Sequence, residues 1–108
     1  MKTLPYTAAT ETGDKFDINF PLHNETGDAV KVHNLISSLL SAIESDIKLS
    51  NGMDNGDVLQ AMAMALAIRA RMIYAPHEVT AQIALDLLST AVNAAGKALH
   101  DQAEAGTA

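Results

Sequence analysis

VLQAMAMALAIRARMIY, residues 58–74, is the stretch that decides the fold of this chain. It contains no helix breaker, and alanine, leucine and methionine are strong helix formers, so it predicts a central helix. On a helical wheel, nearly the whole circumference is apolar, interrupted only by Gln60, Arg69 and Arg71. A helix of this kind is surrounded by protein or spans a membrane, and this one is too short to span. We therefore predict that protein covers the central helix on all sides.

A second helix is predicted over residues 28–49, where apolar side chains recur on one face and Asp28 can act as the N-cap. Gly52 suits the left-handed position that ends such a helix. On the other side of the central helix, Pro76 suits the first turn of a third helix. The sequence thus predicts helices at about 28–49, 57–75 and 76–103.

These helices predict an all-α protein in the form of a three-helix bundle. The short connection at Ala75-Pro76 is expected to make the second and third helices an antiparallel hairpin, with the first helix in one groove. The chain has 108 residues, the size of one ordinary domain. We expect a single domain over residues 1–108, with a helical core at 28–103 and a frayed tail at 104–108.

Residues 1–27 are richer in Thr, Gly, Asp and Asn, and they predict an extended arm or a small β-hairpin. Within them KFDINF, residues 15–20, alternates apolar and polar side chains with the period of a half-buried strand. This strand can pair with residues 3–7 or with residues 29–32. If neither pairing forms, it must add to another chain.

The second and third helices carry more apolar surface than their predicted neighbours can cover. Large exposed apolar patches usually mark interfaces, so we predict a homodimer or higher oligomer. The competing expectation is a compact monomer in which the N-terminal strand folds over the remaining face. The predicted interface consists of Met62, Met64, Leu66, Ile68, Met72, Leu85, Leu88 and Val92.

The polar face of the first helix is small and nearly uncharged, whereas solvated faces usually carry Lys and Glu. It is either a tolerated low-charge surface or a contact face for another protein. The predicted partner-binding residues are Asn34, Ser37, Ser38, Ser41 and Ser45, together with Phe16, Ile18 and Phe20 of the strand.

Charge and composition exclude several classes of function. With 13 acidic and 7 basic residues, a net charge of -6, the chain lacks the basic stripe that nucleic-acid binding requires. The absence of cysteine excludes disulfides, thiol catalysis and sulfur-ligated zinc. The first residues lack the apolar core of a signal peptide, and no apolar run approaches about 20 residues, so we expect no membrane association and a cytoplasmic location.

No motif for catalysis, metal binding or cofactor binding stands out, so we expect no enzyme activity, no metal and no cofactor. NGMDNGD, residues 51–57, resembles a calcium loop, but Met53 and Met62 would occupy ligand positions. His100 and Glu104 have the spacing of two ligands on one helix face, but Glu104 lies in the tail that is expected to fray.

Arg69 is a charge within an apolar arc of the central helix, and two interpretations remain open. Its stem can pack in the core while its guanidinium pairs with Asp86 of the facing helix. Alternatively, Arg69 and Arg71 bind an anionic group at the seam between subunits.

The expected function is protein interaction without catalysis, as a small acidic adaptor, regulator or inhibitor. Small helical proteins of this kind occur among phage and mobile-element products, including antagonists of host systems. Two alternatives stay open. One is a helical oligomer that binds an anionic or nucleotide-like small molecule at the subunit seam, and the other is a structural component of a larger assembly.

Overall fold

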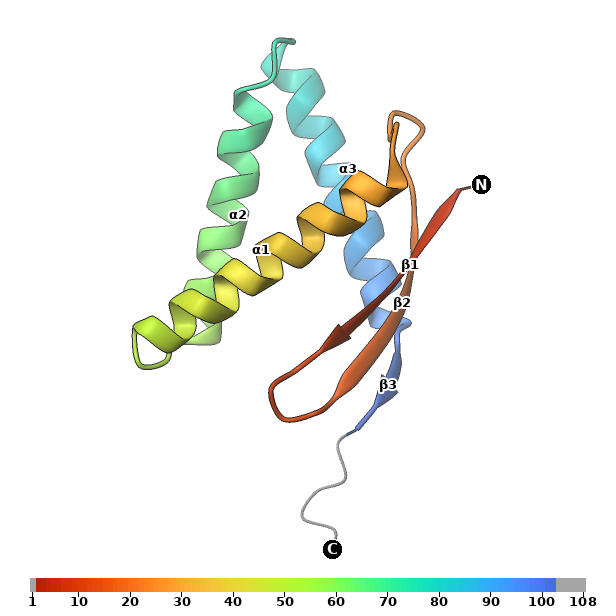
Figure 1. The fold of residues 1–108 in the computed structure, drawn as a ribbon. Coiled ribbons are helices and arrows are strands. Elements are labelled where there is room, and N and C mark those ends of the chain that lie inside the picture. Colours follow the sequence, from red (N-terminus) through yellow and green to blue (C-terminus); the bar gives the residue numbers. More distant parts are fainter. Residues whose placement is uncertain (1, 103–108) are drawn as a thin grey trace, which may run out of the picture. The chain divides into compact units, whose positions relative to one another are not determined.

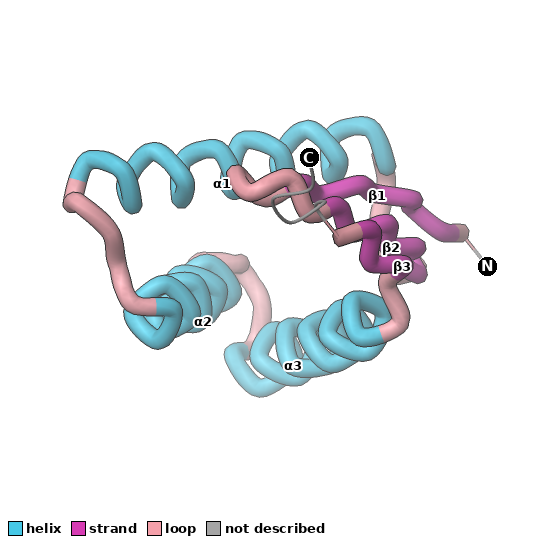
Figure 2. The backbone as a smooth tube through the Cα atoms, turned by 90° about the horizontal axis from the view of Figure 1, so that it is seen from below, coloured by secondary structure: helices cyan, strands magenta, loops and turns pink. Residues whose placement is uncertain are grey.

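The computed structural model describes residues 2–102 and contains both helices and strands. In chain order the elements are β1 (Thr3–Ala9), β2 (Lys15–Pro21), α1 (Ala29–Leu49), α2 (Asn55–Arg71), α3 (His77–Gly96) and β3 (Leu99–Asp101) (Figure 1). The strands form one antiparallel sheet in which β2 lies between β1 and β3 (Figure 2). The fold is therefore α+β, and the predicted all-α class is wrong.

The structure differs most from the prediction at the end of α3, where the sequence predicts a helix that continues to residue 103. The helix instead ends at Gly96, a residue that costs a helix about 0.5–1 kcal/mol relative to alanine. The amides of Lys97 and Ala98 close the last turn on Ala94 and Ala95, and the chain then extends as β3. Because β3 pairs with residues 15–17, far away in the sequence, no local pattern reveals it. The predicted frayed tail at 104–108 lies outside the described residues.

β1 and β2 pair along their full lengths, from Thr3 opposite Pro21 to Ala9 opposite Lys15. This is the first of the two pairings that the sequence leaves open. The register places the apolar side chains of both strands on one face, because directly opposed residues share a face. Leu4 and Tyr6 on this face are each only 9% exposed. A slip of one residue would turn these side chains to the polar face, so the alternation itself specifies the register.

Pro5 protects the outer edge of β1. The amide of Leu22 donates to the Lys2 carbonyl, and the amide of Thr10 donates to the Asp14 carbonyl, so even-numbered residues of this hairpin bond across it. Pro5 therefore turns its nitrogen, which has no proton, away from β2 and towards the open edge. Proline at this position discourages the addition of a further strand.

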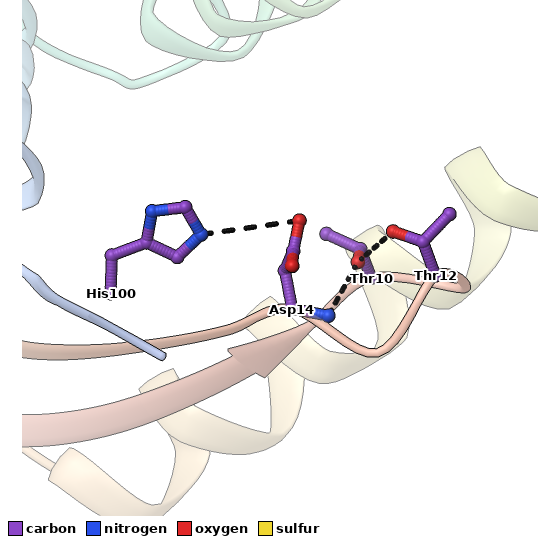
Figure 3. Close-up of polar contacts among 4 residues, drawn as sticks. All are labelled: Thr10, Thr12, Asp14 and His100. Atoms are coloured by element: carbon purple, nitrogen blue, oxygen red, sulfur yellow. Dashed lines mark hydrogen bonds and ion pairs between the residues drawn. The ribbon is translucent and has the colours of Figure 1, made fainter. Parts of the chain in front are cut away.

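The tip of the β1–β2 hairpin also holds β3 (Figure 3). Gly13 has a φ of 93°, and the Asp14 amide donates to the Thr10 hydroxyl over 3.1 Å. The Asp14 carboxylate lies 3.9 Å from Nε2 of His100 in β3. On the apolar face, the His100 ring stacks on Phe16, its cross-strand partner, with 4.2 Å between ring centroids. The short strand β3 is thus fixed by side chains as well as by its ladder.

Replacing His100 by alanine should lower the free energy of unfolding by about 1 kcal/mol, because a stacked ring pair contributes about 0.5–1.5 kcal/mol. Chemical denaturation of the full chain measures this loss. The matched control is His77→Ala at the start of α3, where the histidine is exposed. Equal stability of the two variants would contradict a stabilising role for the Phe16 stack.

By their internal contacts, the described residues form two compact units. One contains the sheet and the second half of α3, from Leu87 onwards, and its buried apolar side chains are Leu4, Tyr6 and Ala94. The other, residues 30–86, contains nearly all of α1, all of α2 and the first half of α3. Among residues 2–102, no large side chain is fully buried.

Within the unit 30–86, the helices do not approach one another closely along their lengths. The predicted three-helix bundle, with an antiparallel hairpin and the first helix in its groove, is therefore wrong. The connection between α2 and α3 is indeed short, but it brings only the adjoining helix ends together. Packing along two helices needs complementary side chains on both, and α2 is apolar around most of its circumference without one defined stripe.

The turn between α1 and α2 has the conformation expected at Gly52. Asn51 and Gly52 have φ values of 61° and 101°, and the Gly52 amide donates to the Ile47 carbonyl over 2.8 Å. The Ser50 hydroxyl donates to the Asp46 carbonyl over 2.9 Å. These bonds satisfy carbonyls at the end of α1, so the predicted left-handed glycine at this helix end is confirmed.

Gly52→Ala should destabilise the protein by about 1–2 kcal/mol, because a side chain is strained at this φ. No atom lies within 4 Å of the position that a Cβ would take, so backbone strain is the whole effect. The matched control is Gly56→Ala in the first turn of α2, which also has open space and should stabilise by about 0.5–1 kcal/mol. Denaturation curves of both variants test the opposite signs.

Candidate functional site

α2 exposes most of its apolar side chains. The buried residue of this helix is Ala70, which is 7% exposed. The five predicted interface residues at this helix are between 40% and 67% exposed: Met62, Met64, Leu66, Ile68 and Met72. Removing one such side chain from water stabilises a complex by about 1.5–3 kcal/mol. α2 therefore carries a large favourable contact surface that the described chain leaves uncovered.

The apolar residues of α2 lie on two opposite sides of the helix, at about 100° per residue. We call the first the Met62 side, which consists of Leu59, Met62, Leu66 and Ala70. The second, the Met64 side, consists of Ala61, Met64, Ala65, Ile68 and Met72. Met64, Ile68 and Met72 on the Met64 side are more exposed than Met62 and Leu66 on the Met62 side. On the Met62 side, Leu59 at the helix start is also well exposed, but Ala70 is buried. The Met64 side is thus the more open of the two.

The three predicted interface residues on α3, Leu85, Leu88 and Val92, are also exposed. The residues that α3 buries are small and lie along another side of the helix, with Thr80 and Ala94 nearly inaccessible. The Thr80 hydroxyl donates to the His77 carbonyl within the same helix. α3 therefore presents a second stripe of exposed apolar side chains.

The predicted partner-binding residues separate into two groups. Those on α1 are all exposed: Asn34, Ser37, Ser38, Ser41 and Ser45. Those on β2 are half-buried on the apolar face of the sheet: Phe16, Ile18 and Phe20. The serine face of α1 is accessible to a second protein, whereas the β2 residues contribute to the sheet itself.

Arg69 and Arg71 are both exposed, but α2 does not bring them together. Residues two apart on a helix point about 200° away from each other. The suggested Arg69–Asp86 ion pair does not form within residues 2–102, and Asp86 instead accepts a hydrogen bond from the Gln82 amide over 2.9 Å. An anion site that uses both arginines stays a prediction, and it would need a second copy of the chain.

In the described part of the chain, no three His, Asp or Glu side chains come close enough to hold a metal ion. The His100–Glu104 pair lies partly outside the described residues, and His100 belongs to β3 rather than to a helix. Sequence reasoning missed the position of His100 in β3 and its stacking on Phe16.

Across residues 2–102, no helix combines the length and apolar character needed to cross a membrane. Comparison with known protein families, with curated proteins and with solved structures gives no match.

Proposed function

We propose that this protein is a non-catalytic interaction protein that assembles with itself through α2. The observation that carries the proposal is the exposure of Met64, Ile68 and Met72 on a helix that buries only Ala70. Leucine, isoleucine and methionine exposed together at helical spacing are typical of a surface that is covered by another protein.

The size of the apolar surface supports a stable assembly. Association costs about 4–15 kcal/mol in lost translational and rotational freedom. Three large side chains from each of two copies, at about 1.5–3 kcal/mol each, can offset this cost. Ala61 and Ala65 allow the helix backbones to approach, and flexible methionines fill irregular gaps.

In the assembled form, the protein would act in the cytoplasm as a small acidic adaptor, regulator or inhibitor. The serine face of α1 supports this part of the proposal, because it is exposed, small and nearly uncharged. It leaves a polar surface for a second protein on a helix other than α2.

Analytical ultracentrifugation of the full chain at micromolar concentration tests the proposal. We expect a dimer or a larger species, with a melting temperature that rises with protein concentration because assembly stabilises the fold by mass action. A monomer whose melting temperature does not depend on concentration would overturn the proposed self-association.

A further inference from the structure

We propose that the partner of α2 is the α2 helix of a second copy, packed antiparallel through the Met64 side, with Asp57 of each copy facing Arg71 of the other. This inference rests on the proposed self-association and specifies its geometry. It follows from the spacing, exposure and charge of residues within one regular helix.

The spacing along the Met64 side is that of a helix–helix seam. Asp57, Ala61, Met64, Ile68 and Arg71 follow one another at intervals of four, three, four and three residues. All of them belong to the uninterrupted helix Asn55–Arg71, so they lie along one side of it. This alternation of three and four keeps a seam in contact with a partner helix.

The charges at the two ends of the seam are opposite. Asp57 lies in the first turn of α2 and Arg71 in its last turn. Both side chains are exposed, and neither forms an ion pair within residues 2–102. Asp54, the N-cap residue, adds a second carboxylate at the acidic end because its side chain makes no capping hydrogen bond.

This charge pattern favours a second copy of α2 as the partner helix and an antiparallel direction for it. A second copy running antiparallel places its basic end beside the acidic end of the first, and two identical pairs form around a two-fold axis. A parallel copy would place like charges together at both ends. The helix dipoles also favour the antiparallel arrangement. Ion pairs at the rim of an interface determine orientation more than affinity.

The Met62 side lacks this complementarity. Its basic residue is Arg69, and the first turn of α2 carries no acidic residue on that side because Asp57 belongs to the opposite one. Ala70, within the same side, is already covered by the chain. The seam that matches a reversed copy of itself is therefore the Met64 side.

Charge reversal tests the pairing of Asp57 with Arg71. Asp57→Lys and Arg71→Glu should each raise the dissociation constant about tenfold, because each creates two like-charge contacts per dimer. The double variant Asp57→Lys/Arg71→Glu restores both pairs and should return to the original affinity. Single variants that assemble as tightly as the original chain, or a double variant that stays weak, would overturn the pairing.

Single cysteines test the direction, since the chain contains no cysteine of its own. Position 64 is midway between 57 and 71, so Met64→Cys should oxidise to a covalent dimer. The two copies of position 72 would lie about 24 Å apart along the axis, at 1.5 Å per residue, far beyond disulfide reach. Met72→Cys should therefore stay uncoupled, and efficient coupling at both positions would show a parallel seam instead.

These results separate the two proposals. If the original chain is a monomer, the proposed self-association is overturned, and the antiparallel seam with it. A dimer that ignores charge reversal, or that couples at position 72, would overturn only the antiparallel seam and leave the self-association standing.

Discussion

Ile68→Asp should dissociate the assembled protein, raising its dissociation constant about a thousandfold or more. Each copy would lose about 1.5–3 kcal/mol of apolar burial and would place a carboxylate in the seam at a further cost. Both copies in a two-fold assembly carry the substitution, so these losses occur twice. Each ~1.4 kcal/mol of lost binding free energy raises the dissociation constant by a factor of ten. Ultracentrifugation across a concentration series measures the shift, and circular dichroism checks that the helices remain.

Leu59→Asp is the matched control for this variant. Leu59 belongs to the same helix and is 67% exposed, compared with 59% for Ile68. It is nine residues away, which places it on the opposite side of α2 at about 100° per residue. We expect its dissociation constant to stay near that of the original chain. If neither variant changes the assembly, α2 is not the interface, and if both dissociate it, α2 is in contact on two sides.

Leu4→Ala should lower the free energy of unfolding by about 2–3 kcal/mol. Leu4 is 9% exposed on the apolar face of the sheet, and its removal leaves a cavity in addition to the lost transfer energy. Chemical denaturation at one fixed protein concentration measures the loss, because assembly also shifts the apparent stability.

Leu49→Ala makes the same chemical change at the end of α1, where the leucine is 85% exposed. It should change the stability by less than about 0.5 kcal/mol. Similar losses in both variants would show that the apolar face of the sheet contributes no more to stability than the surface does.

Local chemistry accounts for the parts of the fold that the sequence predicted well. The helix expected at 28–49 corresponds to α1 at Ala29–Leu49, and the left-handed Gly52 ends it as expected. The strand expected at 15–20 corresponds to β2 and uses the first of its two possible partners. Each of these features depends on residues within one or two turns or one hairpin, where spacing and backbone preference act directly.

Distant pairing accounts for the largest errors. The sequence predicts a helix at Leu99–Asp101 because this segment has no strand pattern of its own and forms β3 only against residues 15–17. The short connection between α2 and α3 predicts a three-helix bundle, but it constrains only the helix ends and not the packing along their lengths. The α2 helix also begins and ends earlier than expected, at Asn55 and Arg71 rather than 57 and 75.

The candidate site on α2 also has a part that can be predicted from local sequence and a part that depends on the fold. The wheel of α2 identified Met62, Met64, Leu66, Ile68 and Met72 as one surplus of apolar surface. It could not rank the two sides, because the burial of Ala70 on one of them depends on the rest of the chain. The Met64 side became distinct only once exposure was combined with Asp57 and Arg71 at its ends.

Composition and helical periodicity are local properties, so the amino-acid sequence is enough to predict a helix within residues 58–74 that is apolar on more than one side. The end of this helix at Arg71, the addition of Leu99–Asp101 to the sheet and the exposure of the Met64 side become visible only in the folded chain. Strand pairing and burial join residues that are distant along the chain. Their free energy depends on which segments meet, and no single segment carries that information.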